Sequence, residues 1–388
     1  MRLRLHTAGE SHGPALVAIL EGLPHGLQIA REAINQDLRR RQEGFGRGGR
    51  MKIECDEVEV LSGLRGGKTL GAPVALVVRN RDFANWVAVM DPFAEPAGEN
   101  SKALTRPRPG HADLAGALKF GIHDARDVLE RASARSTAAR VAAGAVCRSL
   151  LGECGVALFS HVVRIGDIVA PPVDKNHVSA AQKRAESSEV RCADEETSRA
   201  MMAAIAAAQK TGDSLGGVGE VIATGVPPGI GSHVEWTDKL DGRLAQALMS
   251  IQAIKAVEIG LGLQSAERRG SQVHDPILYR DGRFVRPSNH AGGIEGGNSN
   301  GEPIVVRAAM KPIPTLARPL PSVDLQTKQP FSAQKERTDS CAVAAAAVVA
   351  EAAVAFVLAD ALLDKTGGDS MVEVLRNLEG IRGDLANY

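Results

Sequence analysis

The chain has 388 residues, of which 44% are hydrophobic and 24% charged, as in an ordinary globular protein. Lysine plus arginine equals aspartate plus glutamate at 46 each, and aromatic residues make up only 3%. A balanced charge argues against a protein that coats nucleic acid or an anionic membrane, and few aromatic residues argue against a stacking platform for single strands. Only 13 of the 46 basic residues are lysine. Arginine grips phosphate and carboxylate with a planar fork, so the placement of the arginines is informative.

The cysteines and the apolar segments exclude further classes of protein. The five cysteines include no C-x-x-C pair and have no histidine at ligand spacing, so we expect neither a disulfide framework nor a metal site. Residues 1–6 lack the apolar run of a signal peptide. The alanine- and valine-rich stretch 341–363 carries Glu351, which costs about 3 kcal/mol at a bilayer centre. We therefore expect a buried helix there and a cytoplasmic protein.

Hydrophobic periodicity predicts strands and helices interspersed along the whole chain. Strands are predicted, in chain order, before Gly9 and at residues 51–61, 73–78, 156–165, 218–224 and 303–308, with a hairpin over 277–285. Helices are predicted at residues 31–41, 124–151, 195–210, 238–259 and 340–364. Alanine dominates 133–146 and 342–361, so these helices can approach closely and are expected in the core. Because several strands form hairpin-like pairs, antiparallel or mixed sheets are favoured.

Two glycine-rich segments match nucleotide-binding patterns but lack the required context. GFGRGG at residues 44–49 has dinucleotide-fingerprint spacing, yet it follows a charged helix end and precedes a strand, which reverses the order that the fingerprint needs. SGLRGGKT at residues 62–69 has a serine in place of the first glycine of a phosphate-binding loop, and GAP at residues 71–73 cannot continue a helix. The second segment is therefore predicted to be a turn between strands.

Two histidines lie in segments suited to chemistry. GESHG at residues 9–13 places glycines around His12, and an imidazole, with an ordinary pKa of about 6.5, suits proton transfer. RPRPGHAD at residues 106–113 surrounds Arg108 and His111 with prolines and a glycine that stiffen the backbone and pre-organise an anion site. Each segment alone is also compatible with a structural histidine or a basic surface turn.

Further candidate segments lie on the predicted helices and late loops. On the helix predicted at 124–151, Arg131 and Arg135 are four residues apart and are expected to share a face beside small residues. The RRR run at 39–41 and Arg47 add positive charge. Asp339 lies beside an arginine near the start of the last predicted helix, and this segment alone favours a role as N-cap of a helix from Ser340.

Three long segments, in order along the chain, resemble the signature of the chorismate synthase family. They are GESHGPALVAILEGL at residues 9–23, ERASARSTAARVAAGAV at 130–146 and RTDSCAVAAAAVVAE at 337–351. GFGRGGRM, RPGHAD, NHAGGIEGG and KPIPT also look like the family, so the resemblance spans nearly the whole chain. The sequence departs from the family pattern at Thr338, where histidine or serine is usual, and at Ser136, where glutamate is common.

The resemblance implies an α+β fold, a β-α-β sandwich in which long helices pack between two antiparallel sheets. It also implies a single domain over residues 1–388 and assembly as a homotetramer. The implied reaction is the 1,4-elimination of phosphate from 5-enolpyruvylshikimate 3-phosphate to give chorismate, in the shikimate pathway of aromatic amino acid biosynthesis. The reaction needs reduced FMN without net redox change, and the family is also associated with NADP.

The resemblance also carries roles onto individual residues. His12 is expected to protonate or neutralise the leaving phosphate, His111 to manage the protonation of reduced flavin, and Asp339 to assist deprotonation of the substrate ring. The expected FMN contacts are Arg131, Ala132, Ser133, Gln252, Ala253, Gly296, Lys311, Pro312, Ile313, Pro314, Thr315 and Arg337. The guanidiniums expected to hold the substrate phosphate and carboxylates belong to Arg41, Arg47, Arg108 and Arg135.

Two other classes of function remain as alternatives. A conventional flavin oxidoreductase would consume reduced flavin in each turnover. A nucleic-acid-binding protein would use the arginine clusters, although the neutral charge argues against it. The expected partners are the small-molecule substrate and other copies of the chain, with no nucleic acid and no membrane. The sequence leaves open the source of the reduced flavin, whether the chain reduces flavin itself, and how tightly it holds FMN.

Overall fold

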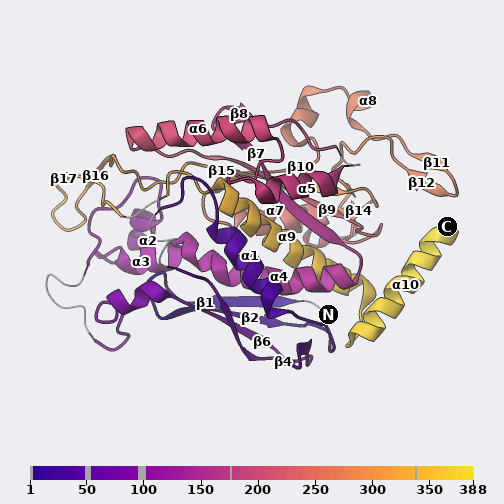
Figure 1. Cartoon of the computed structure of the whole chain (residues 1–388), viewed down its shortest axis with the longest axis horizontal. Helices are drawn as coiled ribbons and strands as arrows, with labels where there is room; N and C mark the ends of the chain where they lie inside the picture. Colours follow the sequence, from indigo (N-terminus) through magenta and orange to yellow (C-terminus); the bar gives the residue numbers. More distant parts are fainter. Residues whose placement is uncertain (1–2, 49–53, 95–101, 175–176, 337–338) are drawn as a thin grey trace.

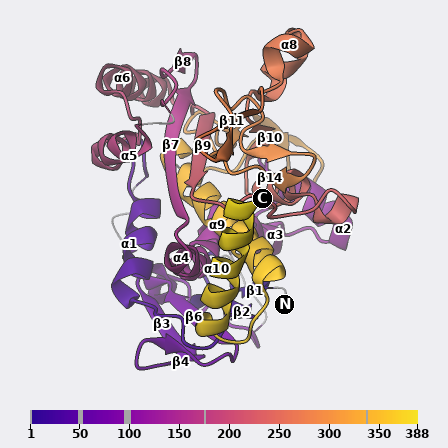
Figure 2. The same ribbon diagram turned by 90° about the vertical axis from the view of Figure 1, so that its right-hand side faces the viewer.

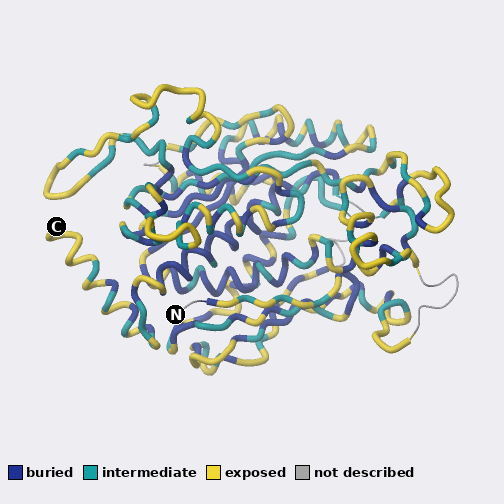
Figure 3. Tube along the Cα trace, turned by 180° about the vertical axis from the view of Figure 1, so that it is seen from behind, coloured by how far each residue is buried: buried dark blue, intermediate teal, exposed yellow. Residues whose placement is uncertain are grey.

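The computed structural model describes residues 3–48, 54–94, 102–174, 177–336 and 339–388. A layer of helices lies between two antiparallel sheets, and both views in Figures 1 and 2 show this order of layers. Buried residues gather in the helix layer and on the sheet faces next to it (Figure 3). The predicted α+β class and β-α-β sandwich are therefore confirmed.

The first sheet has four strands in the order β1-β2-β6-β3. Their bounds are Arg4–Ala8 for β1, Ala15–Glu21 for β2, Val74–Arg79 for β6 and Val58–Ser62 for β3. Along β2, the side chains of Leu16, Ala18 and Leu20 are buried in the main core, whereas Ile19 is exposed. This period of two is what a sheet with one face against helices requires.

The second sheet has five strands in the order β10-β15-β9-β7-β8. Their bounds are Ile254–Ile259 for β10, Ile304–Met310 for β15, Gly217–Thr224 for β9, Ala157–Ile165 for β7 and Ile168–Val169 for β8. Helix α5, residues Val178–Ser187, lies beside β7 (Figure 2) and packs Ala181 and Ala185 against Phe159 and Ile222. This sheet is therefore covered on both faces, by α5 on one side and the helix layer on the other.

The helix layer contains α1 (Arg31–Gln42), α4 (Thr137–Glu153), α7 (Leu240–Met249) and α9 (Val343–Thr366). Helix α4 packs against the first sheet, and α9 packs against the second. The two helices contact each other at Gly144, where a Cβ atom would lie 2.4 Å from the Cβ of Ala352. Alanine and glycine therefore allow the close packing that the composition predicts. By length and composition α9 could cross a membrane, but 89% of its apolar window is buried inside the protein.

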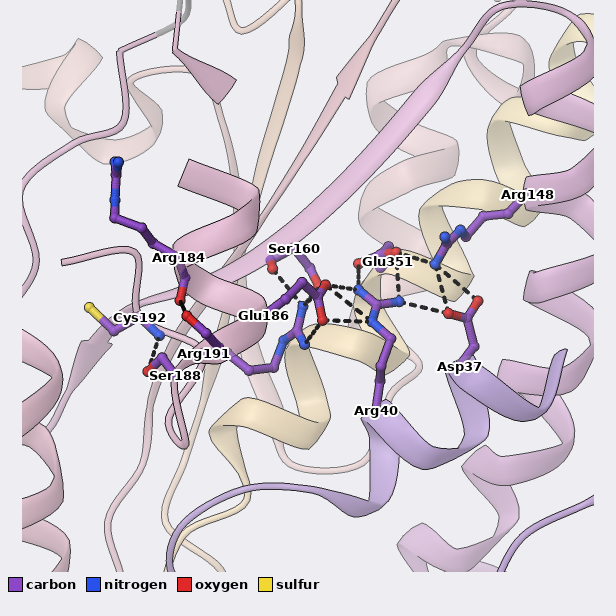
Figure 4. Close-up of polar contacts among 11 residues, drawn as sticks. Asp37, Arg40, Arg148, Ser160, Arg184, Glu186, Ser188, Arg191, Cys192 and Glu351 are labelled. Carbon is purple, nitrogen blue, oxygen red and sulfur yellow. Dashed lines mark hydrogen bonds and ion pairs between the residues drawn. The ribbon is translucent and has the colours of Figure 1, made fainter. Parts of the chain in front are cut away.

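A buried polar network crosses the helix layer (Figure 4). Glu351 of α9, which is 1% exposed, accepts hydrogen bonds from Arg40 of α1 at 2.9 Å and from Arg148 of α4 at 2.7 Å. Both arginines also contact Asp37, each at 2.8 Å, and Arg40 reaches Glu186 of α5 at 2.7 Å. The network therefore joins α1, α4, α5 and α9 through directional bonds.

The remaining described elements lie around the sandwich. The helices are α2 (Asp113–Phe120), α3 (Arg126–Ala132), α6 (Glu195–Thr211), α8 (Gly270–Val273) and α10 (Met371–Asn387), with 3-10 turns η2 (Arg81–Asn85), η4 (Ala134–Ser136), η5 (Trp236–Asp238) and η6 (Gly262–Glu267). The two-stranded ribbons are β4 (Leu64–Arg65) with β5 (Lys68–Thr69), β11 (Leu278–Arg280) with β12 (Arg283–Val285), β13 (Ile294–Glu295) with β14 (Asn298–Ser299), and β16 (Pro321–Val323) with β17 (Pro330–Ser332).

Most predicted elements are confirmed, and two helices are wrong in part. The predicted helix 124–151 is broken at Ser133, whose extended backbone (φ −60°, ψ 140°) separates α3 from η4 and α4. The second half of the predicted helix 238–259 is strand β10. The strand predicted at 51–61 begins only at Val58, and its residues 51–53 lie outside the described part. The turn predicted at 62–69 is the β4–β5 ribbon.

Two glycines of α4 provide a matched test of the packing. Alanine normally stabilises a helix by about 0.5–1 kcal/mol over glycine, and at Gly152 an added Cβ meets nothing within 4 Å. We expect Gly152→Ala to follow that rule. At Gly144 the added Cβ meets the backbone of α9, so Gly144→Ala should destabilise the fold by about 1–3 kcal/mol. Denaturation of both variants checks this, and equal effects would contradict the close α4–α9 contact.

Candidate functional site

The loop after β1 presents His12 to the joint between α3 and α4. Gly9 has a φ of +102°, and a Cβ there would lie 2.2 Å from the carbonyl oxygen of Ala15, so the turn requires glycine. His12 is 8% exposed, and its Nδ1 lies 2.8 Å from Oε1 of Glu130. Its ring stacks on Trp86 with the centroids 3.8 Å apart. The predicted catalytic histidine is thus held on two sides.

Two predicted substrate arginines lie buried around one carboxylate. Arg135 donates from NH1 to both oxygens of Asp56, at 2.6 and 2.8 Å, and Arg41 lies 3.3 Å from the same group. Burial lowers the pKa of Arg41 to about 9, and the charges of Arg135 and Arg47 act in the same direction, while Asp56 opposes them. Arg135 also lies 3.6 Å from the buried carboxylate of Glu54. An anionic ligand would offset the repulsion that Arg135 and Arg47 exert on Arg41.

Arg47 and Asp339 form an ion pair, although the sequence assigned them separate roles. NH1 of Arg47 lies 2.7 Å from Oδ2 of Asp339, and the backbone N–H of Gly48 donates to Oδ1 at 2.5 Å. Helix α9 begins at Val343 with Ala342 as its N-cap. The interpretation of Asp339 as the N-cap of a helix from Ser340 is therefore wrong, because the helix starts one turn later.

The segment predicted as an anion site contains an internal carboxylate. Asp113 is fully buried and accepts from Nε and NH2 of Arg108 at 2.8 and 2.9 Å, and its Oδ1 lies 2.5 Å from Nδ1 of His111. Burial acts to raise the pKa of Asp113, but the hydrogen bonds and charges of His111 and Arg108 outweigh it and hold the pKa well below the usual range. NH1 of Arg108 also donates to Thr315 at 3.1 Å.

The predicted FMN residues follow a continuous series of contacts. Nε2 of Gln252 lies 3.0 Å from Oγ of Ser136 and 3.5 Å from the carbonyl oxygen of Ser133. The next residue, Ala253, accepts at its carbonyl from the backbone N–H of Lys311 at 2.9 Å. The ammonium of Lys311 bonds to the carbonyl of Gly110, beside His111. These contacts join the surroundings of the two histidines.

The other predicted FMN residues are placed less uniformly. Arg131 bonds to the backbone of Thr7 and Gly9, so its guanidinium does not share a face with Arg135, because the chain breaks at Ser133. Ala132 ends α3 and lies next to that break. Gly296 lies in the β13–β14 hairpin. The neighbouring Gly297 accepts from the first residue of α7, whereas Gln252 lies shortly after the last residue of that helix, so the two lie at opposite ends of α7. Pro312, Ile313 and Pro314 follow Lys311 in a segment without regular secondary structure. Arg337 lies outside the described residues.

Sequence reasoning missed the partners of the site residues. Glu130, Asp56 and Asp113 each contact a predicted cation, and Trp86 stacks on His12. Glu130 and Asp113 stood inside the segments that carried the resemblance, so their motif position was a usable signal. Asp56 lies within the strand predicted at residues 51–61, where the alternation indicated only a sheet with one wet face.

A cavity of about 410 Å³ opens beside the Glu351 network and is distinct from this site. Its lining residues are Gln36, Asp37, Arg39, Arg40, Glu43, Arg148, Gln182 and Glu186. None of them belongs to the predicted site. Helix α1 contributes to both the cavity and the candidate site, because Arg40 lines the cavity and the next residue, Arg41, contacts Asp56.

The geometry defines the class of protein: a β-α-β sandwich whose loops join two histidines with carboxylate-bound arginines, as in an enzyme that acts on a small anion. The chorismate synthase family model matches residues 3–363. The chorismate synthase of Moorella thermoacetica is 58% identical over 382 residues, covering 98% of each chain. That of Trichlorobacter lovleyi is 55% identical over 394 residues, covering 100% of each chain. A crystal structure of chorismate synthase, 44% identical, matches with a TM-score of 0.80 over 100% of this chain and 99% of that chain.

The chain belongs to the chorismate synthase family, whose members are carbon–oxygen lyases of the shikimate pathway. The resemblance stated from the three signature segments is therefore confirmed. The segments that carry it converge in the structure, since Ser11 of the first bonds to Ser133 of the second at 3.1 Å.

The Asp113 carboxylate provides a test of pH-dependent stability. Asp113→Asn leaves the buried guanidinium of Arg108 without its charge partner, which should cost about 3–5 kcal/mol. A carboxylate with a lowered pKa stabilises the fold above its unfolded pKa of about 3.9, and this stability is lost as the pH falls through the folded value. The difference between wild type and variant should thus be full above about pH 5 and shrink below about pH 4. A pH-independent difference in unfolding free energy would contradict this assignment.

Proposed function

We propose that the chain converts 5-enolpyruvylshikimate 3-phosphate to chorismate by 1,4-elimination of phosphate, with reduced FMN required and no net redox change. The observation that carries this proposal is the buried pair Arg41 and Arg135, which share the carboxylate of Asp56, in a chain matched by the family model over residues 3–363. The charges of Arg135 and Arg47 both act to lower the pKa of Arg41, so these guanidiniums repel one another even though Asp56, Glu54 and Asp339 pair with them. Such a site attracts a substrate that carries one phosphate and two carboxylates.

The arginines bind and orient this substrate. Arg41 and Arg135 contribute charge from the buried side of the site, and Arg47 contributes a guanidinium that is 12% exposed in its side chain. Arg108 adds positive charge from a guanidinium that Asp113 fixes in place. A bidentate guanidinium–phosphate contact is stronger and more directional than a contact with a lysine ammonium.

The titratable residues manage protons at different positions. His12 protonates or neutralises the leaving phosphate, and His111, fixed by Asp113, manages protonation near the flavin. Asp339 assists removal of the ring proton of the substrate. Its contact with Arg47 at 2.7 Å orients the carboxylate in the site.

The residues proposed to hold FMN offer suitable chemical groups. Oε1 of Gln252 is buried without a hydrogen-bond partner among the described residues, so it can accept from a flavin ring N–H. Lys311 supplies a cation that suits a phosphate. With them we assign Arg131, Ala132, Ser133, Ala253, Gly296, residues 312–315 and Arg337. When bound, reduced FMN supplies a transiently donated electron that it later recovers.

We also propose that residues 1–388 form one domain that assembles as a cytoplasmic homotetramer. The main core cluster supports the single domain, because it includes residues from Leu3 to Leu378. Exposed Ile19 and Leu61 on the first sheet supply apolar surface for another copy. No nucleic acid or membrane partner is proposed, and NADP is relevant only as a source of electrons for the flavin.

The flavin requirement has a stoichiometric test. Anaerobic assays with 5-enolpyruvylshikimate 3-phosphate should give chorismate only when photoreduced FMN is present, and the flavin spectrum should be unchanged after many turnovers. The reason is that the elimination has no net redox change. Oxidation of one flavin per product would instead indicate the alternative function, a conventional flavin oxidoreductase.

Asp339→Asn tests the proposed base against a purely electrostatic role. Asparagine can still accept from Gly48 but is not a base, so turnover should fall by at least about 100-fold while FMN binding and melting temperature are kept. If Asp339 only oriented Arg47, the variant would resemble Arg47→Ala and raise KM rather than lower kcat. A near-normal kcat would remove Asp339 from the proposed proton transfer.

A further inference from the structure

Glu130 holds His12 at two points. Its Oε1 lies 2.8 Å from Nδ1 of the imidazole, and its Oε2 accepts from the backbone N–H of His12 at 2.8 Å. Glu130 is 3% exposed, and Arg126 lies 3.5 Å from Oε1. Burial acts to raise the pKa of Glu130, but the hydrogen bonds and charge of His12 and the charge of Arg126 outweigh it, so the pKa is lowered. An ionised carboxylate therefore faces Nδ1.

Trp86 fixes the plane of the same ring. It is 7% exposed, and the indole and imidazole planes are 24° apart with centroids separated by 3.8 Å. The backbone of Trp86 is anchored, since its N–H donates to Phe83 at 2.8 Å at the end of η2. The ammonium of Lys102 lies 3.6 Å from the indole centroid, and the guanidinium of Arg126 lies 5.3 Å from it. The indole is thus a buried flat surface on which the imidazole stacks.

The two contacts together determine which nitrogen exchanges a proton. Because an acceptor carboxylate lies at Nδ1, the neutral ring carries its hydrogen there, and proton exchange with a ligand falls to Nε2. The hydrogen bond to Glu130 alone would still let the imidazole ring rotate about the Nδ1–Oε1 direction. The stack on Trp86 prevents this rotation. A carboxylate that orients an imidazole from its far side is a general device for fixing tautomer and direction.

We propose that Glu130 and Trp86 are positioning residues that fix the tautomer and the ring plane of His12 for proton delivery from Nε2. This rests on the role of His12 in the proposed function. Neither residue touches the reacting atoms in this assignment. Both act through His12, so their effect depends on its presence.

A double-mutant cycle tests the dependence. Glu130→Gln keeps the shape and removes the charge, and it should lower kcat about 10- to 100-fold while the substrate KM and the FMN dissociation constant change less than about threefold. The same substitution placed in a His12→Ala enzyme should slow it less than about twofold further. Trp86→Leu should lower kcat in the same way as Glu130→Gln, and only when His12 is present. Trp86→Phe should keep most of the rate because an aromatic face remains.

The outcomes separate the two proposals. If His12→Ala slows the reaction but Glu130→Gln slows the His12→Ala enzyme as much as the wild type, positioning is overturned and the role of His12 stands. If His12→Ala leaves kcat unchanged, the proposed role of His12 fails and positioning fails with it. An equal rise in KM for Glu130→Gln in both backgrounds would mean a structural role only, which also overturns the proposal.

A spectroscopic test does not depend on activity. The chain has two tryptophans, and Trp236 is 77% exposed, so Trp236→Phe leaves Trp86 as the sole indole. The imidazole of His12 stacks on this indole and sets its surroundings, so in the flavin-free Trp236→Phe protein we expect His12→Ala to change the emission of Trp86. Emission that stays the same without His12 would show that the stack is absent in solution and would overturn the proposal.

Discussion

The buried carboxylate of Glu351 is the constraint on which the helix layer depends. It lies within α9 among alanine and valine side chains, whose packing is close but not directional. Burial acts to raise its pKa, but the charges of Arg40 and Arg148 and the hydrogen bonds of Arg40 and Ser160 outweigh burial, and the pKa is lowered. Loss of one partner from such a group costs about 3–5 kcal/mol, so the bonds of Glu351 set the register of α1 and α4 against α9 (Figure 4).

This register also orients the candidate site. Arg40 and Arg41 are consecutive in α1, so their side chains diverge by about 100° around the helix. Because Arg40 is held by Glu351, Arg41 is directed to Asp56 and Thr137, at the start of α4. The orientation of α1 about its own axis therefore places Arg40 in the core and Arg41 in the site at the same time. A substitution in the core network would consequently shift Arg41 relative to Asp56.

The sequence was sufficient for most elements, because segments with clear periodicity fold as local physics predicts. The family and the layers followed from the resemblance of the three long signature segments. It was insufficient where a tertiary contact overrides propensity. Ser133 interrupts a segment of good helix formers, since its side chain accepts from the backbone N–H of Arg135 while its carbonyl faces Gln252. Residues 254–259 form a strand, because β15 offers backbone partners that a local pattern cannot reveal. The start of α9 was misjudged because Asp339 bonds to Gly48, which is distant in sequence.

The candidate site follows one electrostatic rule that links these observations. Several predicted cationic or titratable groups are held by a carboxylate. The carboxylate comes from another part of the chain in Arg47 with Asp339, Arg135 with Asp56 and His12 with Glu130, and from the same segment in Arg108 with Asp113. Such pairs keep the side chains oriented before a ligand arrives, so less reorganisation is needed when it binds. Glu130 and Asp113 lay inside motifs, but motifs could not reveal the pairs between distant segments. A motif records neighbours along the chain, whereas such pairing depends on how β1, α1 and α4 meet. At Asp56 the pairing is shared, because Arg41 and Arg135 both contact this carboxylate and Arg135 also lies 3.6 Å from Glu54. An anionic substrate there would offset the repulsion between the two guanidiniums, which acts to lower the pKa of Arg41.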